Sequence, residues 1–360
     1  MTNLTLRAGP RALKHIRANG LRAEDIDIIP GAAGGPKGLG IAGLDLAVFG
    51  EWLHKSNRVA PRTRHLIGAS IGAWRFAALC RGEAAQGLND FTKAYSEQRY
   101  PLRPSKQFVS QSARDMMSDL FSGREHEVLT NPYYRLHILA VRGLGLLKNE
   151  SKTTTPAAFA AAALANAFGR RHLRHFVARS VFYDARERPA ALNGDAFDTF
   201  QTQSVELSEA NLGEALRASG AIPLVLEGVK DISGALPGTY WDGGIIDYHL
   251  HLPYHRNAGL VLYPHFTDKI VPGWLDKALP WRRASGTWLD NVVLLAPSKE
   301  YLAKLPFGKL PDRKDFSRFE GDYAGRMHYW RKAMAESERL GDEFLALVES
   351  GNIAARLEPL

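Results

Sequence analysis

The N-terminal part of the chain alternates twice between a short apolar segment and a helix-like segment, with a glycine-rich turn at the first junction. Residues 25–30 and 65–67 predict buried strands, and residues 39–53 and 71–80 predict helices. This order is typical of a mostly parallel sheet, because consecutive parallel strands need a crossover connection and the crossover is usually a helix. We therefore predict an α/β fold of three layers, with helices on both faces of a mostly parallel central sheet.

The rest of the chain extends this pattern and ends in helices. Further strands are predicted at residues 136–141, 176–183, 239–246, 259–263 and 292–295, and further helices at residues 156–168 and 209–219. Residues 323–350 repeat apolar side chains at helical spacing, which predicts a helical C-terminal segment. We expect a main domain over residues 1–270 and a mostly helical extension over residues 271–360, packed on the same domain.

Charge and cysteine content narrow the range of functions. The 360 residues carry a net charge of +8, which favours an anionic partner such as nucleic acid or a phospholipid surface, although solubility explains it equally well. No recognised nucleic-acid-binding motif accompanies the charge, so we expect no nucleic-acid partner. Cys80 is the single cysteine, which excludes an internal disulfide and a cysteine-rich zinc site. The N-terminal residues lack the apolar core of a signal peptide, and we expect a cytoplasmic protein.

The strongest local signal is the pentapeptide GASIG at residues 68–72, a G-x-S-x-G motif between a predicted strand and a predicted helix. A sharp strand-to-helix turn exposes the serine hydroxyl above the sheet, and the flanking glycines permit the crowded backbone. The next amide, that of Ile71, would lie at a helix N-terminus and could bind an oxyanion. The alternative is a turn serine that caps a helix. The strand–turn–helix context favours Ser70 as a nucleophile.

A second glycine-rich segment, GGPKG at residues 34–38, lies one strand–helix unit earlier. A phosphate-binding loop of the Walker type requires Ser or Thr after the lysine, whereas Gly38 follows Lys37. Residues 38–43 match the dinucleotide pattern G-x-G-x-x-G, but no acidic residue ends the next predicted strand. Backbone amides in such a loop also hold negative charge in an oxyanion hole. This last interpretation agrees best with a serine nucleophile downstream.

The third signal is the sequence WDGG at residues 241–244, which alone indicates only an Asp-Gly turn. Together with GGPKG and GASIG, and in this order, it resembles the motifs of the patatin-like phospholipase family. The segment ALRASGAIP at residues 215–223 is similar to the family's segment before the aspartate motif. The resemblance covers residues 26–250. Two departures are Ala33, in place of the first glycine of the family's usual triplet, and the sequence IIDYHL after DGG, where the family usually has an asparagine.

The resemblance implies a three-layer patatin-like fold and a serine-dependent lipid acyl hydrolase, with a lipid or acyl ester as substrate and without a metal or other cofactor. It implies a dyad in which Ser70 attacks the ester carbonyl and Asp242 takes the serine proton. A carboxylate with an ordinary pKa of about 4 is a weak base, so we expect burial to raise the pKa of Asp242. The oxyanion-hole residues implied by the resemblance are Gly34, Gly35, Lys37, Gly38 and Ile71.

Two other functions fit parts of the sequence. An α/β-hydrolase-type carboxylesterase or thioesterase would use Ser70 with a late histidine, and His249, His251, His255 and His265 are the candidates. A non-enzymatic nucleotide-binding module would use residues 38–43. The same histidines could instead form a metal site, but incidental packed or solvated histidines are the favoured explanation.

A peripheral contact with an anionic membrane surface is the remaining option. An Ala-rich segment at residues 156–168 precedes the basic residues Arg170, Arg171, Arg174 and Arg179. An apolar helix beside basic residues is one pattern of interfacial binding, although a core helix with a basic solvent edge is commoner. The aromatic and basic residues between 274 and 288 suggest the same contact.

Overall fold

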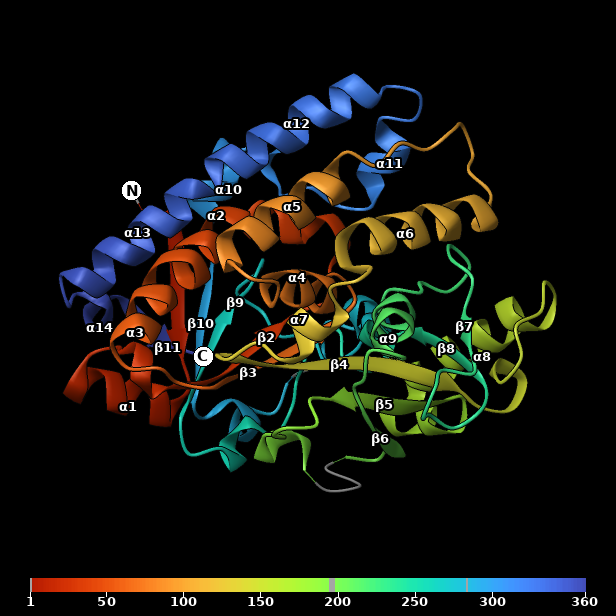
Figure 1. The fold of residues 1–360 in the computed structure, drawn as a ribbon, viewed down its shortest axis with the longest axis horizontal. Helices are drawn as coiled ribbons and strands as arrows, with labels where there is room; N and C mark the ends of the chain where they lie inside the picture. Colours follow the sequence, from red (N-terminus) through yellow and green to blue (C-terminus); the bar gives the residue numbers. More distant parts are fainter. Residues whose placement is uncertain (1, 194–197, 283) are drawn as a thin grey trace.

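The computed structural model describes residues 2–193, 198–282 and 284–360. One sheet forms its centre, in the order β11-β1-β10-β9-β2-β3-β4-β5-β6, and β8 joins it by pairing with both β4 and β7 (Figure 1). The strands are β1 (Leu4–Ala8), β2 (Ile26–Gly31), β3 (Arg64–Ala69), β4 (Tyr134–Gly143), β5 (Val177–Tyr183), β6 (Thr202–Glu206), β7 (Val229–Lys230), β8 (Thr239–Asp242), β9 (Leu260–Pro264), β10 (Val292–Pro297) and β11 (Leu357–Pro359).

The run of strands from β10 through β9, β2 and β3 to β4 is parallel throughout. Antiparallel pairs occur toward the sides, where β1 pairs with β10 and where β5 and β8 pair with β4. Every residue of β3, β9 and β10 is buried, as expected for parallel strands covered on both faces. The mostly parallel α/β sheet confirms the predicted fold class.

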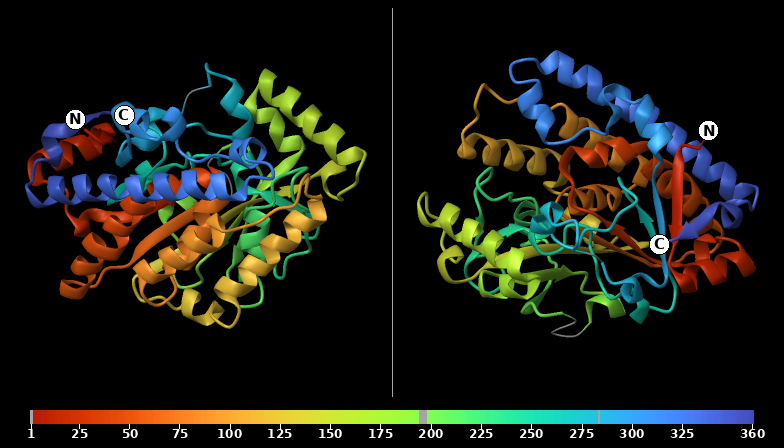
Figure 2. Two further views of the ribbon diagram at one scale, coloured as in Figure 1. Left: turned by 90° about the horizontal axis from the view of Figure 1, so that it is seen from above. Right: turned by 180° about the vertical axis from the view of Figure 1, so that it is seen from behind.

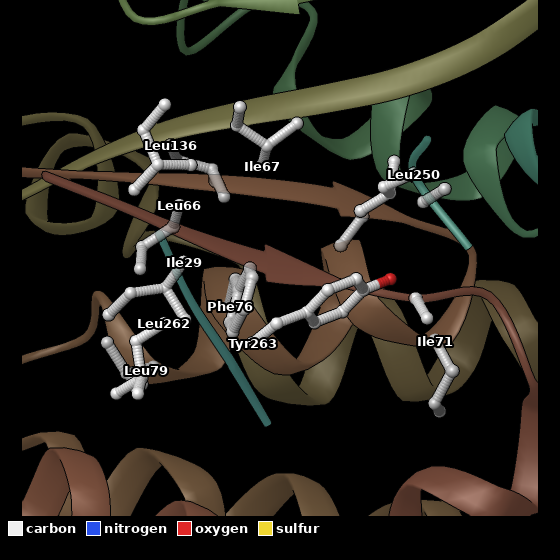
Figure 3. Packing of buried hydrophobic residues seen from close by; sticks show 14 of the residues in the cluster. Ile29, Leu66, Ile67, Ile71, Phe76, Leu79, Leu136, Leu250, Leu262 and Tyr263 are labelled. Carbon is white, nitrogen blue, oxygen red and sulfur yellow. The ribbon is translucent and has the colours of Figure 1, made fainter. Parts of the chain in front are cut away.

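Helices surround this sheet along the whole chain. They are α1 (Pro10–Asn19), α2 (Ala42–Asp45), α3 (Leu53–Val59), α4 (Ile71–Leu79), α5 (Ala84–Ser96), α6 (Lys106–Phe121), α7 (Glu125–Leu129), α8 (Thr154–Phe168), α9 (Leu212–Ser219), α10 (Lys299–Lys304), α11 (Lys314–Arg318), α12 (Tyr323–Glu336), α13 (Glu338–Glu349) and α14 (Ile353–Arg356). Phe76 and Leu79 of α4 lie against Ile29 and Leu66 of the central strands (Figure 3). The apolar side of α4 thereby fixes the position of its N-terminal residue, Ile71, at the end of β3.

Helices cover both faces of the sheet, as two successive residues of β8 show. Neighbouring side chains of a strand point to opposite faces of its sheet. The Asp242 side chain points toward the beginning of α4, where it contacts Ser70. The Trp241 side chain points the other way and packs edge-on against Phe159 of α8, with ring centroids 5.5 Å apart. A separate apolar cluster joins Trp241 to the buried side of α8.

The C-terminal residues contribute to the same sheet. Strand β10 lies between β1 and β9, so residues on both sides of the expected boundary at 270 share one hydrogen-bonded layer. Helices α12 and α13 run end to end along one side of the molecule (Figure 2). The two helices meet at Ser337, whose hydroxyl accepts a hydrogen bond from the Gly43 amide at 2.8 Å.

Two predicted elements differ in detail. The helix expected over residues 39–53 is a succession of a 3-10 helix at Gly35–Ile41, α2, a π-helix at Leu46–Trp52 and α3. The glycines of this segment contribute to the irregularity, because glycine destabilises the interior of a regular helix. Close packing requires them here, since a Cβ at Gly43 would lie 2.4 Å from backbone atoms of Ser337. The strand expected over residues 239–246 ends at Asp242 and continues as a 3-10 turn.

Candidate active site

Ser70 occupies a sharp turn between β3 and α4. Its backbone angles, φ 54° and ψ −128°, lie in a region that non-glycine residues rarely adopt. The adjacent glycines permit this turn, because a Cβ at Gly72 would lie 1.9 Å from the carbonyl oxygen of Gly31 and a Cβ at Gly68 would lie 2.5 Å from the Cα of Ala73. The strained geometry presents the Ser70 hydroxyl at the end of the sheet, which is the arrangement of a nucleophile elbow.

The Ser70 hydroxyl donates a hydrogen bond to Oδ2 of Asp242 at 2.7 Å. The two residues are 172 positions apart in the sequence and come together because β8 pairs with β4, placing Asp242 opposite Ala140. The other carboxylate oxygen accepts a hydrogen bond from the Gly244 amide at 2.7 Å. Both side chains are buried, so the second contact fixes the orientation of the carboxylate toward the serine.

Burial raises the pKa of Asp242 above its ordinary value, in the direction predicted from the sequence. The nearby Arg313 guanidinium and the hydrogen bonds from Ser70 and Gly244 act against this, because they favour the ionised form. A carboxylate with a raised pKa accepts the serine proton more readily than an ordinary one. The environment therefore suits Asp242 as a base toward Ser70.

The glycine-rich loop lies beside this pair. The Ala33 amide is not free, because it donates a hydrogen bond to the carbonyl oxygen of Tyr248 at 2.9 Å. Gly35 has a φ of +57°, a left-handed conformation that favours glycine, and it lines the same cavity as Ser70 and Ile71. Ile71 is the first residue of α4, and amides in the first turn of a helix have no acceptor within it. The amides of Gly35 and Ile71 are thus the two candidate oxyanion donors that border the cavity.

The other predicted loop residues pack behind the cavity. The Lys37 ammonium lies 4.9 Å from the centre of the Phe266 ring, and burial, with Lys277 nearby, lowers the pKa of Lys37 to about 8. A Cβ at Gly34 would lie 2.5 Å from the same ring, and one at Gly38 would lie 3.2 Å from the Ile71 side chain. These three residues support the loop, and none is among the described residues that line the cavity.

The cavity above Ser70 has a volume of about 460 Å³. Its walls come from α4, the connection of α5 to α6, the segment after α9, and residues of the C-terminal part of the chain. The apolar and aromatic side chains in these walls include Trp74, Tyr95, Val109, Met116, Ile222 and Phe316. Such a lining favours a hydrocarbon chain as the bound group.

Two functional candidates, Ser219 and Arg313, were missed in the sequence. The Ser219 hydroxyl accepts a hydrogen bond from the Ser70 amide at 2.8 Å and donates one to the carbonyl oxygen of Leu139 at 2.6 Å. Ser219 lies in the ALRASGAIP segment that resembles the family's segment before the aspartate motif, but for this residue itself the sequence predicts only the end of a helix. Arg313 lies with its guanidinium 3.9 Å from Oδ2 of Asp242 and over the Trp274 ring. No motif marks this residue, which lies far downstream of the three glycine-rich segments.

Ser219→Ala is expected to lower kcat by about 10- to 100-fold with little change in KM, because it removes the contact that holds the Ser70 backbone in its strained turn. The loss of a buried hydrogen bond on each side of the hydroxyl should also destabilise the fold by about 1–3 kcal/mol. Steady-state kinetics and urea unfolding of the same preparation measure both effects. An unchanged kcat would show that Ser219 does not position the nucleophile.

Arg313→Gln is expected to move the acidic limb of the pH–kcat/KM profile to higher pH. The carboxylate of Asp242 must be ionised to act as a base, and removing a neighbouring positive charge raises its pKa further. Activity therefore falls at a higher pH in the variant than in the wild type. Arg313→Lys, which keeps the charge, should lie between the two profiles. An acidic limb that does not move in Arg313→Gln would exclude this coupling.

The alternative sites are not assembled near Ser70. His249 and His265 are buried, and their Nδ1 atoms contact the carbonyl oxygens of Lys269 and Thr267. No histidine is among the described residues that line the cavity. In the described part of the chain no group of three or more His, Cys, Asp or Glu residues could hold a metal ion. Burial lowers the pKa of His265 to about 3, so this imidazole stays neutral.

The segment at residues 38–43 is packed rather than open. Gly38, Gly40 and Gly43 are buried, and a Cβ at Gly40 would lie 2.6 Å from the Leu310 side chain. The glycines therefore permit close contact with the C-terminal segments of this chain. A nucleotide-binding loop would instead need to be open at this place in order to admit a phosphate.

The comparison with known families agrees with this geometry. The family model for patatin-like phospholipase matches residues 32–250, more than half of the chain. None of the curated proteins matches the sequence. The matched region contains the glycine-rich loop, the Ser70 turn and the DGG segment that the structure brings together. The chain belongs to the patatin-like phospholipase family.

Proposed function

We propose that this protein hydrolyses carboxylic esters of lipids through an acyl-enzyme on Ser70, in the manner of a phospholipase A or lysophospholipase. Family membership supports lipid acyl hydrolysis in general. The single observation that carries the finer proposal is the buried 2.7 Å hydrogen bond from Ser70 to Asp242. Its position at the floor of an apolar cavity fits an ester whose acyl chain enters the cavity.

In the first half of the reaction, Oγ of Ser70 attacks the ester carbonyl carbon while Oδ2 of Asp242 takes the hydroxyl proton. The carbonyl oxygen becomes an oxyanion, which the amides of Gly35 and Ile71 would stabilise. The tetrahedral intermediate collapses as the C–O bond to the alcohol breaks, and the protonated Asp242 gives its proton to the leaving oxygen. An acyl ester of Ser70 and a free alcohol result.

In the second half, water attacks the acyl-enzyme. Asp242 takes a proton from this water, the same amides hold the second oxyanion, and the proton returns to Oγ of Ser70 as the fatty acid leaves. A single carboxylate therefore serves as base and acid in both halves. None of these steps needs a histidine.

The test is release of free fatty acid from phospholipid, lysophospholipid and p-nitrophenyl ester substrates by the purified full-length protein. We expect hydrolysis, with a pre-steady-state burst of alcohol product where deacylation is the slower step. A folded preparation that releases no acyl group from any of these esters would contradict the proposal. Headgroup and chain-length series then define the preferred substrate.

A further inference from the structure

Four large apolar side chains are exposed around the mouth of the cavity. They are Leu102 at 69% exposure, Phe108 at 43%, Leu224 at 54% and Val225 at 47%, and we call this group the apolar rim. Each is next to the cavity wall: Leu102 stands between the lining residues Pro101 and Pro104, Phe108 precedes Val109, and Val225 is itself a lining residue. Isolated exposed apolar residues are ordinary, but a cluster at a site entrance indicates a binding surface.

The two segments that carry the apolar rim are in direct contact. The Glu227 amide donates a hydrogen bond to the Ser110 hydroxyl at 2.8 Å, and Arg114 forms an ion pair with Glu227 at 3.5 Å. The start of α6 and the segment after α9 are therefore joined side by side. The connection from α5 to α6 projects from the body of the molecule at the end opposite α1 and α3 (Figure 1), so it is free to approach a surface.

Apart from Glu97 at its start, the charged residues of this connection are all positive. Between Glu97 and Asp115 the sequence has no acidic residue but contains Arg99, Arg103, Lys106 and Arg114. Lys106 and Arg114 are held in ion pairs with glutamates. Arg99 and Arg103 are exposed, and within the described part of the chain neither guanidinium forms an ion pair. Glu320 lies nearby and accepts a hydrogen bond from the Arg103 amide.

We propose that the apolar rim, with Arg99 and Arg103, is the surface by which the protein binds an anionic lipid bilayer. Exposed apolar side chains would enter the boundary of the acyl chains while the two guanidinium groups meet lipid phosphates. The cavity would then open directly onto the bilayer, so that an acyl chain passes from the lipid phase to Ser70 without crossing water. The role of the surface in catalysis rests on the proposed function, but the binding itself requires no chemistry.

A rival surface is the outward side of α8. This helix contains no charged residue, and its Leu164 and Phe168 are exposed, next to the exposed Arg171 and Arg174. Two of the arginines that suggested a membrane contact in this region form ion pairs inside the protein. Arg179 is buried between Asp247 and Asp198, and Arg170 pairs with Asp276. Helix α8 also packs on the face of β8 opposite Ser70. A bilayer bound there would not meet the cavity mouth.

The experiment is co-sedimentation of the full-length Ser70→Ala protein with phosphatidylcholine vesicles, with and without phosphatidylserine. In this inactive background we expect binding to vesicles that contain phosphatidylserine, weakening as salt rises. The triple variant Leu102→Ser, Phe108→Ser and Leu224→Ser should bind at least about tenfold more weakly. Arg103→Gln should lose part of the binding, and only with the anionic vesicles.

Two controls make the result specific. Val59→Ser removes an exposed apolar side chain on α3, far from the rim, and should bind as the parent does. The double variant Leu164→Ser and Phe168→Ser tests the α8 surface and should also bind normally. A rim variant that binds like its parent, an α8 variant that loses as much binding as the rim variant, or an absence of vesicle binding by the parent would each overturn the proposal.

The same substitutions in the Ser70 protein separate binding from catalysis. Hydrolysis of a soluble short-chain ester should be unchanged in the rim variant, whereas hydrolysis of vesicle phospholipid should fall by at least about tenfold with the loss of binding. Vesicle binding without hydrolysis of any ester would contradict the proposed function and leave the docking surface intact. Hydrolysis of soluble and vesicle esters with equal efficiency in both proteins would refute docking alone.

Discussion

Ser70→Ala is expected to reduce ester hydrolysis by at least about 10⁴-fold, to the level of the solvent reaction plus whatever the oxyanion donors contribute. Among the residues that the structure describes, Ser70 supplies the only hydroxyl that donates a hydrogen bond to the Asp242 carboxylate at the floor of the cavity. The alanine Cβ occupies the same place as the serine Cβ, so the strained turn and the hydrogen bond from the residue 70 amide to Ser219 remain. Fatty-acid release under substrate saturation measures the effect.

Variants of the late histidines are the matched controls. His251→Ala, His255→Ala, His249→Gln and His265→Gln should each keep activity within about tenfold of the wild type, since none of these imidazoles takes part in the proposed steps. Circular dichroism and the melting temperature establish that each variant is folded. A folded histidine variant as inactive as Ser70→Ala would contradict the dyad and favour a serine–histidine mechanism.

Asp242→Asn is expected to reduce kcat/KM by about 10³-fold or more, because general-base catalysis contributes on the order of 10²–10⁴-fold and the amide cannot accept the serine proton. The amide keeps the shape of the carboxylate and its oxygen can still accept the bond from Gly244. Substrate binding should therefore change little. The acidic limb of the pH profile, which reports ionisation of the Asp242 carboxyl, should disappear from the residual activity.

Asp247→Asn is the natural control for this substitution. Asp247 lies close in the sequence but forms its ion pair with the buried Arg179, away from Ser70. Its amide variant should lose stability, because it weakens a buried charge pair, and retain the acidic limb. An Asp242→Asn protein that keeps wild-type kcat/KM, or an acidic limb that persists unchanged in it, would remove Asp242 from the mechanism.

The fold class could be predicted because its signals are local. Strands β2 and β3 are short apolar runs that end in glycine-rich turns, and helices follow both. Strand β1 was missed, because its five residues are stabilised by pairing with β10 and β11, which come from the other end of the chain. The same long-range pairing places β10 inside the sheet, whereas the sequence predicted the strand at residues 292–295 within a mostly helical extension.

The geometry of a parallel sheet alone does not pair Ser70 with Asp242, since β8 runs antiparallel to β4. The Ser70–Asp242 pair could nevertheless be anticipated, because the motifs GASIG and WDGG together resemble those of the patatin-like phospholipase family. Ser219 and Arg313 could not. The role of Ser219 depends on where α9 packs against β4, and that of Arg313 on how the C-terminal part of the chain folds back over the cavity. The part of the chain without recognisable motifs thus supplies a wall of the site.

The structure also limits the membrane contacts that the apolar segment at residues 156–168 suggested. Among the described residues no helix is long and apolar enough to cross a membrane. The apolar segment at residues 156–168 forms α8, which buries one side on Trp241 and exposes the other. Sequence alone could not distinguish arginines that face outward from those buried in ion pairs, because Arg171 and Arg179 occur in the same basic segment.

The most direct test of the central claim is covalent labelling with a fluorophosphonate probe, followed by mass mapping of the modified peptide. We expect one adduct, on Ser70, in the wild-type protein. We expect none in Ser70→Ala and much slower labelling in Asp242→Asn, with all proteins folded by their melting temperatures. An adduct on another residue, or no adduct in a folded wild-type protein, would contradict the assignment of Ser70 as a nucleophile activated by Asp242.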